Sequence, residues 1–262
     1  MQQILYLDVG NSRIKAAGIQ DGRWKQIAVF SAHEPDLTTK LDQVSFGYEK
    51  LIVASVRKGL QPADLQGMVS VPVTGISKED IPAGRIRYKS LQTFGIDRFL
   101  ACLGAWSLDV RDLAYTKDRA GDTTGKSPNK RMPVIVSDAG TACTIDVMDA
   151  EGVYIGGVIM PGLHMMIQML AEKADGLYDV SPEIPVRWPP DTTEAALQAG
   201  TAGSFVMAWE AHVQKHLKHY PGASVWITGG DAPFLEECIS FTVQTDPALV
   251  FEGMRCLTNG FQ

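Results

Sequence analysis

The chain has 262 residues, and its 24 Lys and Arg residues against 30 Asp and Glu residues give a formal net charge of −6. An acidic chain without a stripe of basic residues is poorly suited to neutralising rows of phosphates, which argues against nucleic-acid binding as its main activity. The 45% hydrophobic and 21% charged residues exclude a disordered protein, and because neither a signal peptide nor a membrane span is recognisable, we expect a cytoplasmic protein without a membrane partner.

The first predicted elements are a strand, a glycine turn and a second strand over residues 4–19. A short apolar run ends at Asp8, Gly10 permits a tight turn, and an alternating pattern then resumes. Asp8 at the strand end is suited to hold a hydrated magnesium ion. A plain β-hairpin is the alternative for this segment taken alone. Main-chain N–H groups and polar side chains of such a turn suit a phosphate group, and the candidate segment is Asp8, Val9, Gly10, Asn11, Ser12, Arg13, Ile14 and Lys15.

The rest of the first half alternates predicted strands with a helix that starts near Asp97. Strands are expected over 24–30, 50–56 and 69–74. Asp97 is either a simple N-cap of the helix or a carboxylate general base beside Arg98, whose guanidinium would bind an anionic substrate. Tyr88 would add a hydroxyl to the same pocket.

The second half repeats the pattern of the first with an offset of 130 residues. Residues 134–149 again give a strand, a glycine turn and a strand, with Asp138 matching Asp8 and Thr141 matching Asn11. Two phosphate-facing turns related by pseudo-symmetry favour nucleotide binding over a plain hairpin. The further predicted elements are strands over 154–159 and 225–228 and helices over 163–173, 192–219 and 247–257.

This repeat predicts an α/β protein of two duplicated domains with a cleft between them. The expected boundaries are an N-terminal domain over 1–115, a flexible polar insert over 116–131 and a C-terminal domain over 132–262. Neither turn is a Walker A loop, and no GxGxxG follows a strand, which argues against P-loop and Rossmann nucleotide binding.

Six motifs occur in order along the chain: DVGNSRIK, the stretch from Tyr88 to Arg98 that ends in GIDR, DAGTACTID, GGVIMPG, DTTEAALQAG and ITGGDA. Together they resemble the type III pantothenate kinases of the sugar kinase, actin and heat-shock ATPase superfamily. The resemblance covers nearly the whole chain except the polar insert. It implies two ribonuclease H-like domains, a homodimer, and ATP-dependent phosphorylation of pantothenate to 4′-phosphopantothenate, the first step of coenzyme A synthesis.

The resemblance also implies a role for each matching position. Asp8 to Lys15 match the first phosphate loop, Thr141 a nucleotide contact, and Asp138 the position that coordinates a monovalent cation, potassium or ammonium. Asp97 matches the general base. The positions that match pantothenate contacts are Tyr88, Gly95, Ile96, Asp97, Arg98 and Thr192, with Thr193 remaining an alternative to Thr192.

The sequence departs from the family pattern at two positions before the GIDR motif. Leu91 stands where Pro is frequent, and Phe94 stands where Leu is common; we interpret both as packing changes. A non-catalytic regulatory relative and another small-molecule kinase of the superfamily remain the alternative functions, since a fold does not determine an activity.

Overall fold

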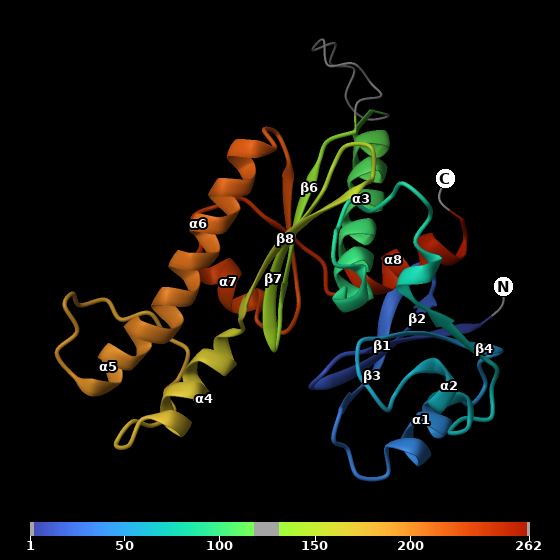
Figure 1. Cartoon of the computed structure of the whole chain (residues 1–262), viewed down its shortest axis with the longest axis horizontal. Helices are drawn as coiled ribbons and strands as arrows, with labels where there is room; N and C mark the ends of the chain where they lie inside the picture. Colours follow the sequence, from blue (N-terminus) through green and yellow to red (C-terminus); the bar gives the residue numbers. More distant parts are fainter. Residues whose placement is uncertain (1–2, 118–130, 261–262) are drawn as a thin grey trace. The chain divides into compact units, whose positions relative to one another are not determined.

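The computed structural model describes residues 3–117 and 131–260, and its α/β fold divides into two units (Figure 1). The first unit comprises Met1–Lys117 and Ala248–Gln262, and the second comprises Asp118–Pro247. Each unit contains one five-stranded sheet.

The sheet of the first unit has the strand order β3-β2-β1-β4-β5. Strands β1, β2 and β3 pair antiparallel, whereas β4 pairs parallel with β1 and β5 with β4. Because side chains alternate across a strand, Leu5, Leu7 and Val9 of β1 all enter the same hydrophobic core. The strands are β1 (Ile4–Val9), β2 (Arg13–Gln20), β3 (Arg23–Ser31), β4 (Lys50–Ser55) and β5 (Val73–Ile76).

The sheet of the second unit repeats this arrangement, with the order β10-β9-β6-β7-β8. Strand β6 pairs antiparallel with β7 and parallel with β9, as β1 does with β2 and β4. This equivalence confirms the duplication that the repeat predicts. The strands are β6 (Val134–Ala139), β7 (Ala142–Met148), β8 (Tyr154–Pro161), β9 (Ser224–Thr228) and β10 (Gln244–Thr245).

The helices of each unit follow the predicted order with one subdivision. The segment expected as a single helix over 192–219 is helical in three parts, because a π-helical turn over Ala199–Gly203 separates α5 from α6. Helices α1, α2 and α7 were not predicted, since each is short. The helices are α1 (Leu37–Ser45), α2 (Pro62–Gln66), α3 (Ile96–Lys117), α4 (Leu163–Lys173), α5 (Thr193–Gln198), α6 (Ser204–His219), α7 (Ala232–Cys238) and α8 (Leu249–Thr258).

The position of helix α8 differs from the prediction, which placed this part of the chain in a C-terminal domain over 132–262. The helix belongs to the first unit, where it packs on α3. Glycines make this contact close, because a Cβ at Gly104 of α3 would lie 2.0 Å from the Leu249 carbonyl oxygen, and a Cβ at Gly253 would lie 2.0 Å from that of Leu100. The buried Glu252 adds polar contacts, accepting from Trp24 Nε1 at 3.0 Å.

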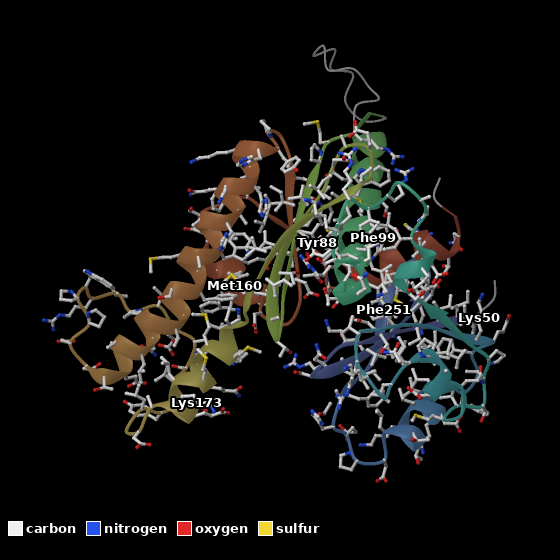
Figure 2. The ribbon with its side chains drawn as sticks, in the orientation of Figure 1. Lys50, Tyr88, Phe99, Met160, Lys173 and Phe251 are labelled. Carbon is white, nitrogen blue, oxygen red and sulfur yellow. The ribbon has the colours of Figure 1, made fainter. Side chains whose placement is uncertain are left out.

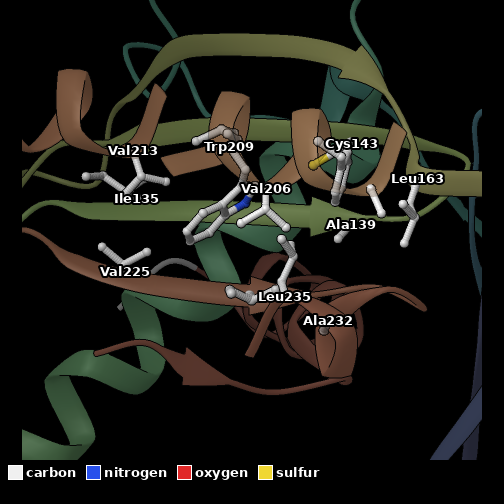
Figure 3. Packing of buried hydrophobic residues seen from close by; sticks show 14 of the residues in the cluster. Ile135, Ala139, Cys143, Leu163, Val206, Trp209, Val213, Val225, Ala232 and Leu235 are labelled. Atoms are coloured by element: carbon white, nitrogen blue, oxygen red, sulfur yellow. The ribbon is translucent and has the colours of Figure 1, made fainter. Parts of the chain in front are cut away.

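The core of the second unit surrounds Trp209 of α6 (Figure 3). Its indole lies among Ile135, Val206 and Val225, and its Nε1 donates to Ser137 Oγ at 2.9 Å. The same cluster includes Ala139 and Cys143, which pair across the hairpin that carries the second glycine turn. The turn is therefore anchored in the core at both of its ends.

Among the described helices, none combines the length and apolar character needed to cross a bilayer. Helix α3 continues through Lys117, into the start of the predicted insert over 116–131. Residues 118–130 of that insert lie outside the described residues, so its predicted flexibility stays a prediction.

Candidate active site

The first glycine turn joins β1 to β2 through Gly10, Asn11 and Ser12. Its closing bond runs from Gly10 N to Arg13 O at 3.0 Å, and a Cβ at Gly10 would lie 3.1 Å from that same oxygen. Ala32 N, after β3, donates to Ser12 O at 2.9 Å. Asn11, Ser12 and Arg13 are exposed at the tip, so the turn presents main-chain and polar groups to solvent.

Strand pairing places Asp8 directly opposite Lys15 and Val9 opposite Ile14. Asp8 and Lys15 are half-buried, and because they are directly opposite each other, their side chains project to the same face of the hairpin. Val9 and Ile14 are fully buried on the other face. Their side chains cannot reach a ligand, and only their main chains contribute to the predicted loop.

The second turn, between β6 and β7, is one residue shorter. Gly140 N donates to Ala142 O at 3.2 Å, and Gly162 N, at the start of α4, donates to Thr141 O at 3.1 Å. Gly162 has no room for a side chain, because its Cβ would lie 2.0 Å from Gly140 O. Thr141 is exposed at the tip of this turn.

Asp138 is half-buried at the end of β6, opposite Thr144 of β7 and Thr228 of β9. Directly after Thr228, Gly229 has a φ of 98°, which favours glycine, and a Cβ there would lie 2.2 Å from Ala139 O. Carboxylate and hydroxyl oxygens therefore occupy neighbouring positions on three adjacent strands. Hard cations prefer oxygen ligands, so these residues fit an alkali-metal ion.

Asp97 lies in the first turn of α3, because this helix begins at Ile96. Its Oδ1 accepts the main-chain N–H of Arg98 at 2.9 Å, and an acidic group is favoured at a helix N-terminus. A Cβ at Gly95 would lie 2.5 Å from the same Oδ1. Gly95 therefore leaves the space that the carboxylate occupies, while Ile96, only 4% exposed, anchors the helix start in the core.

Arg98 is only 7% exposed, and two aromatic rings lie against its guanidinium. Its Cζ is 5.6 Å from the Tyr88 ring centroid and 5.8 Å from that of Phe94, and the two rings are 5.2 Å apart. Figure 2 shows Tyr88 beside α3, which carries Arg98. Aromatic rings on a guanidinium restrict its movement, and a fixed guanidinium can bind a carboxylate through two parallel hydrogen bonds.

Thr192 lies in the second unit as the N-cap of α5. Its Oγ1 accepts the Ala195 N–H at 3.1 Å, and Thr193 is already the first helical residue. Both threonines are exposed. Thr192 thus has a capping role whether or not it also contacts a substrate.

Within residues 3–117 and 131–260, no three His, Cys, Asp or Glu side chains are grouped so that they could hold a metal ion. A magnesium ion at Asp8 would have one carboxylate available and would keep most of its water ligands. This fits magnesium, which loses water reluctantly and usually shares its coordination with substrate phosphates.

Sequence reasoning missed three contributors to these sites. Phe94 was interpreted as a packing change, yet its ring contacts both Arg98 and Tyr88. Gly229 belongs to the quoted ITGGDA motif but received no role, although a glycine pair directly after a strand signals a close backbone approach. Arg57 carried no motif signal at all, and its Nη1 donates to Asn11 O at 3.1 Å.

Comparison with known proteins points to one family. A model of the type III pantothenate kinases matches residues 117–215. The chain is 27% identical over 254 residues to a type III pantothenate kinase of Flavobacterium johnsoniae, with 96% of this chain and 95% of the relative covered. It is 28% identical over 263 residues to a type III pantothenate kinase of Phocaeicola vulgatus, with 95% of each covered.

Solved structures agree on the fold. A Campylobacter jejuni protein assigned to the Baf family of transcriptional activators superposes with a TM-score of 0.57 at 20% identity, covering 97% of this chain and 96% of that one. A Listeria monocytogenes protein assigned as an N-acetylmannosamine kinase gives 0.50 at 10% identity, covering 98% and 99%. The duplicated sheets and these likenesses confirm two ribonuclease H-like domains of the actin and sugar kinase type. Relatives named type III pantothenate kinases thus align with this chain along nearly its whole length, and the chain is similar to that family.

Proposed function

We propose that the protein transfers the γ-phosphoryl group of ATP to pantothenate, which gives 4′-phosphopantothenate in the first step of coenzyme A synthesis. Similarity to the type III pantothenate kinases supports this reaction. The observation that carries it is the arrangement at the start of α3, where Gly95 makes room for the Asp97 carboxylate and the rings of Tyr88 and Phe94 hold the Arg98 guanidinium.

Asp97 acts as the general base in this proposal. Pantothenate carries a primary hydroxyl at one end and a carboxylate at the other. Asp97 accepts the hydroxyl proton while the oxygen attacks the γ-phosphorus; the transition state is loose, so the carboxylate mainly orients the hydroxyl. Arg98 holds an anionic or polar part of pantothenate, and Tyr88, Gly95, Ile96 and Thr192 supply the other proposed contacts.

The first turn, from Asp8 to Lys15, is proposed to bind ATP phosphates through main-chain N–H groups and the Lys15 ammonium, and Thr141 is a further proposed nucleotide contact. Asp8 would hold magnesium through water, and Asp138 would hold potassium or ammonium. When bound, these cations offset the phosphate charge. The protein's own part is to orient the phosphates and to keep the hydroxyl in line with the phosphorus.

We further propose a cytoplasmic homodimer whose other partners are ATP and pantothenate. The four cysteines all lie in the described residues and form no disulfide with one another, which suits a reducing compartment. Large exposed apolar side chains favour burial against a second copy. They occur on α4 and in the segment that follows it, at Met165, Met169, Tyr178, Ile184, Val186 and Trp188.

The test is ADP release by the purified protein with ATP and magnesium across a panel of acceptors. Pantothenate should give ADP release well above the ATP-only background, whereas acetate and hexoses should not. Release with another acceptor alone would identify a different small-molecule kinase. Folded protein that is silent with every acceptor would support the regulatory alternative.

A further inference from the structure

Arg57 lies at the edge of the first sheet that carries the first glycine turn. It follows β4, and because β4 runs parallel to β1, the chain after β4 emerges beside the end of β1. The bond from Val56 N to Val9 O, at 3.1 Å, extends the pairing one residue beyond β4. The path of the chain therefore brings Arg57 to the turn.

Local hydrogen bonds hold the main chain of Arg57 in place. Its N–H donates to Ser55 Oγ at 3.2 Å, and its carbonyl accepts from Gln61 Nε2 at 2.6 Å. The half-buried side chain then extends from a fixed backbone. Such a side chain loses less freedom when it makes a contact than one on a mobile loop.

The guanidinium of Arg57 bridges two segments beside the turn. Nη1 donates to the Asn11 carbonyl at 3.1 Å, and Nη2 lies 3.3 Å from Nδ1 of His33, which follows β3. Arginine only donates, so His33 accepts here through an unprotonated Nδ1. Ala32 N holds the next carbonyl, that of Ser12. Two successive carbonyls of the turn, those of Asn11 and Ser12, thus accept hydrogen bonds from the segments that follow β4 and β3.

Holding the Asn11 carbonyl has a direct consequence for the next N–H group. A peptide unit is planar and trans, so its C=O and N–H point in opposite directions. The carbonyl of Asn11 and the N–H of Ser12 belong to one such unit. Because the carbonyl points toward Arg57, the Ser12 N–H points away from it.

In the second turn, the Gly162 N–H donates to Thr141 O, as the Ala32 N–H donates to Ser12 O in the first turn. The first turn is one residue longer. Its additional carbonyl, that of Asn11, accepts from Arg57. Asp231 follows β9 as Arg57 follows β4, but its Oδ1 lies 3.6 Å from His164 Nε2.

We propose that Arg57 is a positioning residue for the first turn: it fixes the Asn11–Ser12 peptide so that the Ser12 N–H is directed at a phosphate group of the nucleotide. This inference rests on the proposed binding of ATP at this turn. It assigns no contact between Arg57 and pantothenate. Loss of Arg57 should therefore weaken nucleotide binding selectively.

The test compares Arg57→Gln with Arg23→Gln, a matched loss of charge at an exposed arginine that begins β3, at the opposite end of that strand from the turn. Loss of one charge-assisted hydrogen bond predicts an ATP KM raised about tenfold for Arg57→Gln. Its kcat and pantothenate KM should stay within about twofold of those of Arg23→Gln. Arg57→Lys, which keeps the charge and one donor, should show a smaller rise.

An ATP KM within twofold of the Arg23→Gln value would overturn the proposal, and so would an equal rise in the pantothenate KM, which would indicate a general structural role. If Arg57→Gln does not fold, Arg57→Lys decides by the same criteria. Calorimetric titration with ADP separates this proposal from the proposed function. Even if the wild type does not phosphorylate pantothenate, ADP should bind about tenfold more weakly to Arg57→Gln than to Arg23→Gln, and equal affinities would refute the role of Arg57.

Discussion

The Oδ1 atom of Asp97 occupies the space that a side chain at Gly95 would need, 2.5 Å from the position of its Cβ. The carboxylate is not the flexible end of a long side chain, because it also accepts the Arg98 N–H at 2.9 Å. Any substitution at Gly95 must therefore displace either the carboxylate or the start of α3.

Gly95→Ala should lower kcat more than it changes the ATP KM. Displacing a catalytic group by about 1 Å costs on the order of 100-fold in rate. Steady-state kinetics with pantothenate and ATP varied separately would measure this effect. Gly67→Ala is a suitable control, because its Cβ would meet only Asp64 O at an ordinary 3.7 Å. Normal kcat in Gly95→Ala would show that the observed carboxylate position does not matter for turnover.

Phe94→Leu should raise the pantothenate KM and leave the ATP KM unchanged. The substitution removes one of the two rings that restrict Arg98, and a partly desolvated cation–π contact contributes about 0.5–2 kcal/mol, equivalent to roughly 2- to 30-fold. Phe46→Leu is the matched control, since that ring is 87% exposed. A pantothenate KM equal to that of the control would mean that Tyr88 alone suffices to hold the guanidinium.

Asp138→Asn should abolish the response of the enzyme to potassium and weaken ATP binding. The neutral amide no longer balances the charge of a cation bound beside Asp138 and its strand partners, Thr144 of β7 and Thr228 of β9. Potassium would be titrated into a sodium-only buffer at fixed ATP, with Asp175→Asn as an exposed control. Wild-type activity that is indifferent to potassium and ammonium would contradict the cation site.

Glu252→Ala should destabilise the first unit by about 1–3 kcal/mol, because it leaves the hydrogen-bond donors around this buried carboxylate without an acceptor. The carboxylate, with 3% of its side chain exposed, pairs with Arg255, whose pKa it raises, and also accepts from Trp24 and Ser107. Urea unfolding would measure the change. Glu34→Ala, in a surface pair with Lys40, should barely move the midpoint. Similar midpoints for both variants would refute this account of how α8 is held.

The two glycine turns could be predicted from sequence because local rules determine them. Asp8 and Asp138 each end an apolar run and are followed by a glycine, and the repeat itself indicated duplicated sheets. The start of α3 was equally local: apolar residues at helical spacing follow Asp97. Strand β5 was placed four residues too early, at Val69 instead of Val73, because a short edge strand after Pro72 has little pattern of its own.

Contacts between residues distant in sequence could not be predicted. The return of α8 to the first unit depends on Gly104 and Gly253. Both glycines lie within helices, and their role becomes clear only from the contact between α3 and α8. The contact of Arg57 with Asn11 joins residues 46 positions apart. The cation–π contact of Phe94 with Arg98 depends on how the loop that carries Tyr88 folds back, and no sequence periodicity predicts that path.

The most direct test of the account is the amount of 4′-phosphopantothenate, measured by mass spectrometry, that the wild type and Asp97→Asn form from pantothenate and ATP. The matched control is Asp21→Asn, at an exposed turn position with φ of 51° that asparagine also adopts readily. We expect product from the wild type and the control, and about 100- to 10,000-fold less from Asp97→Asn with nucleotide binding retained. No product from folded wild-type protein, or near-normal turnover by Asp97→Asn, would contradict the account.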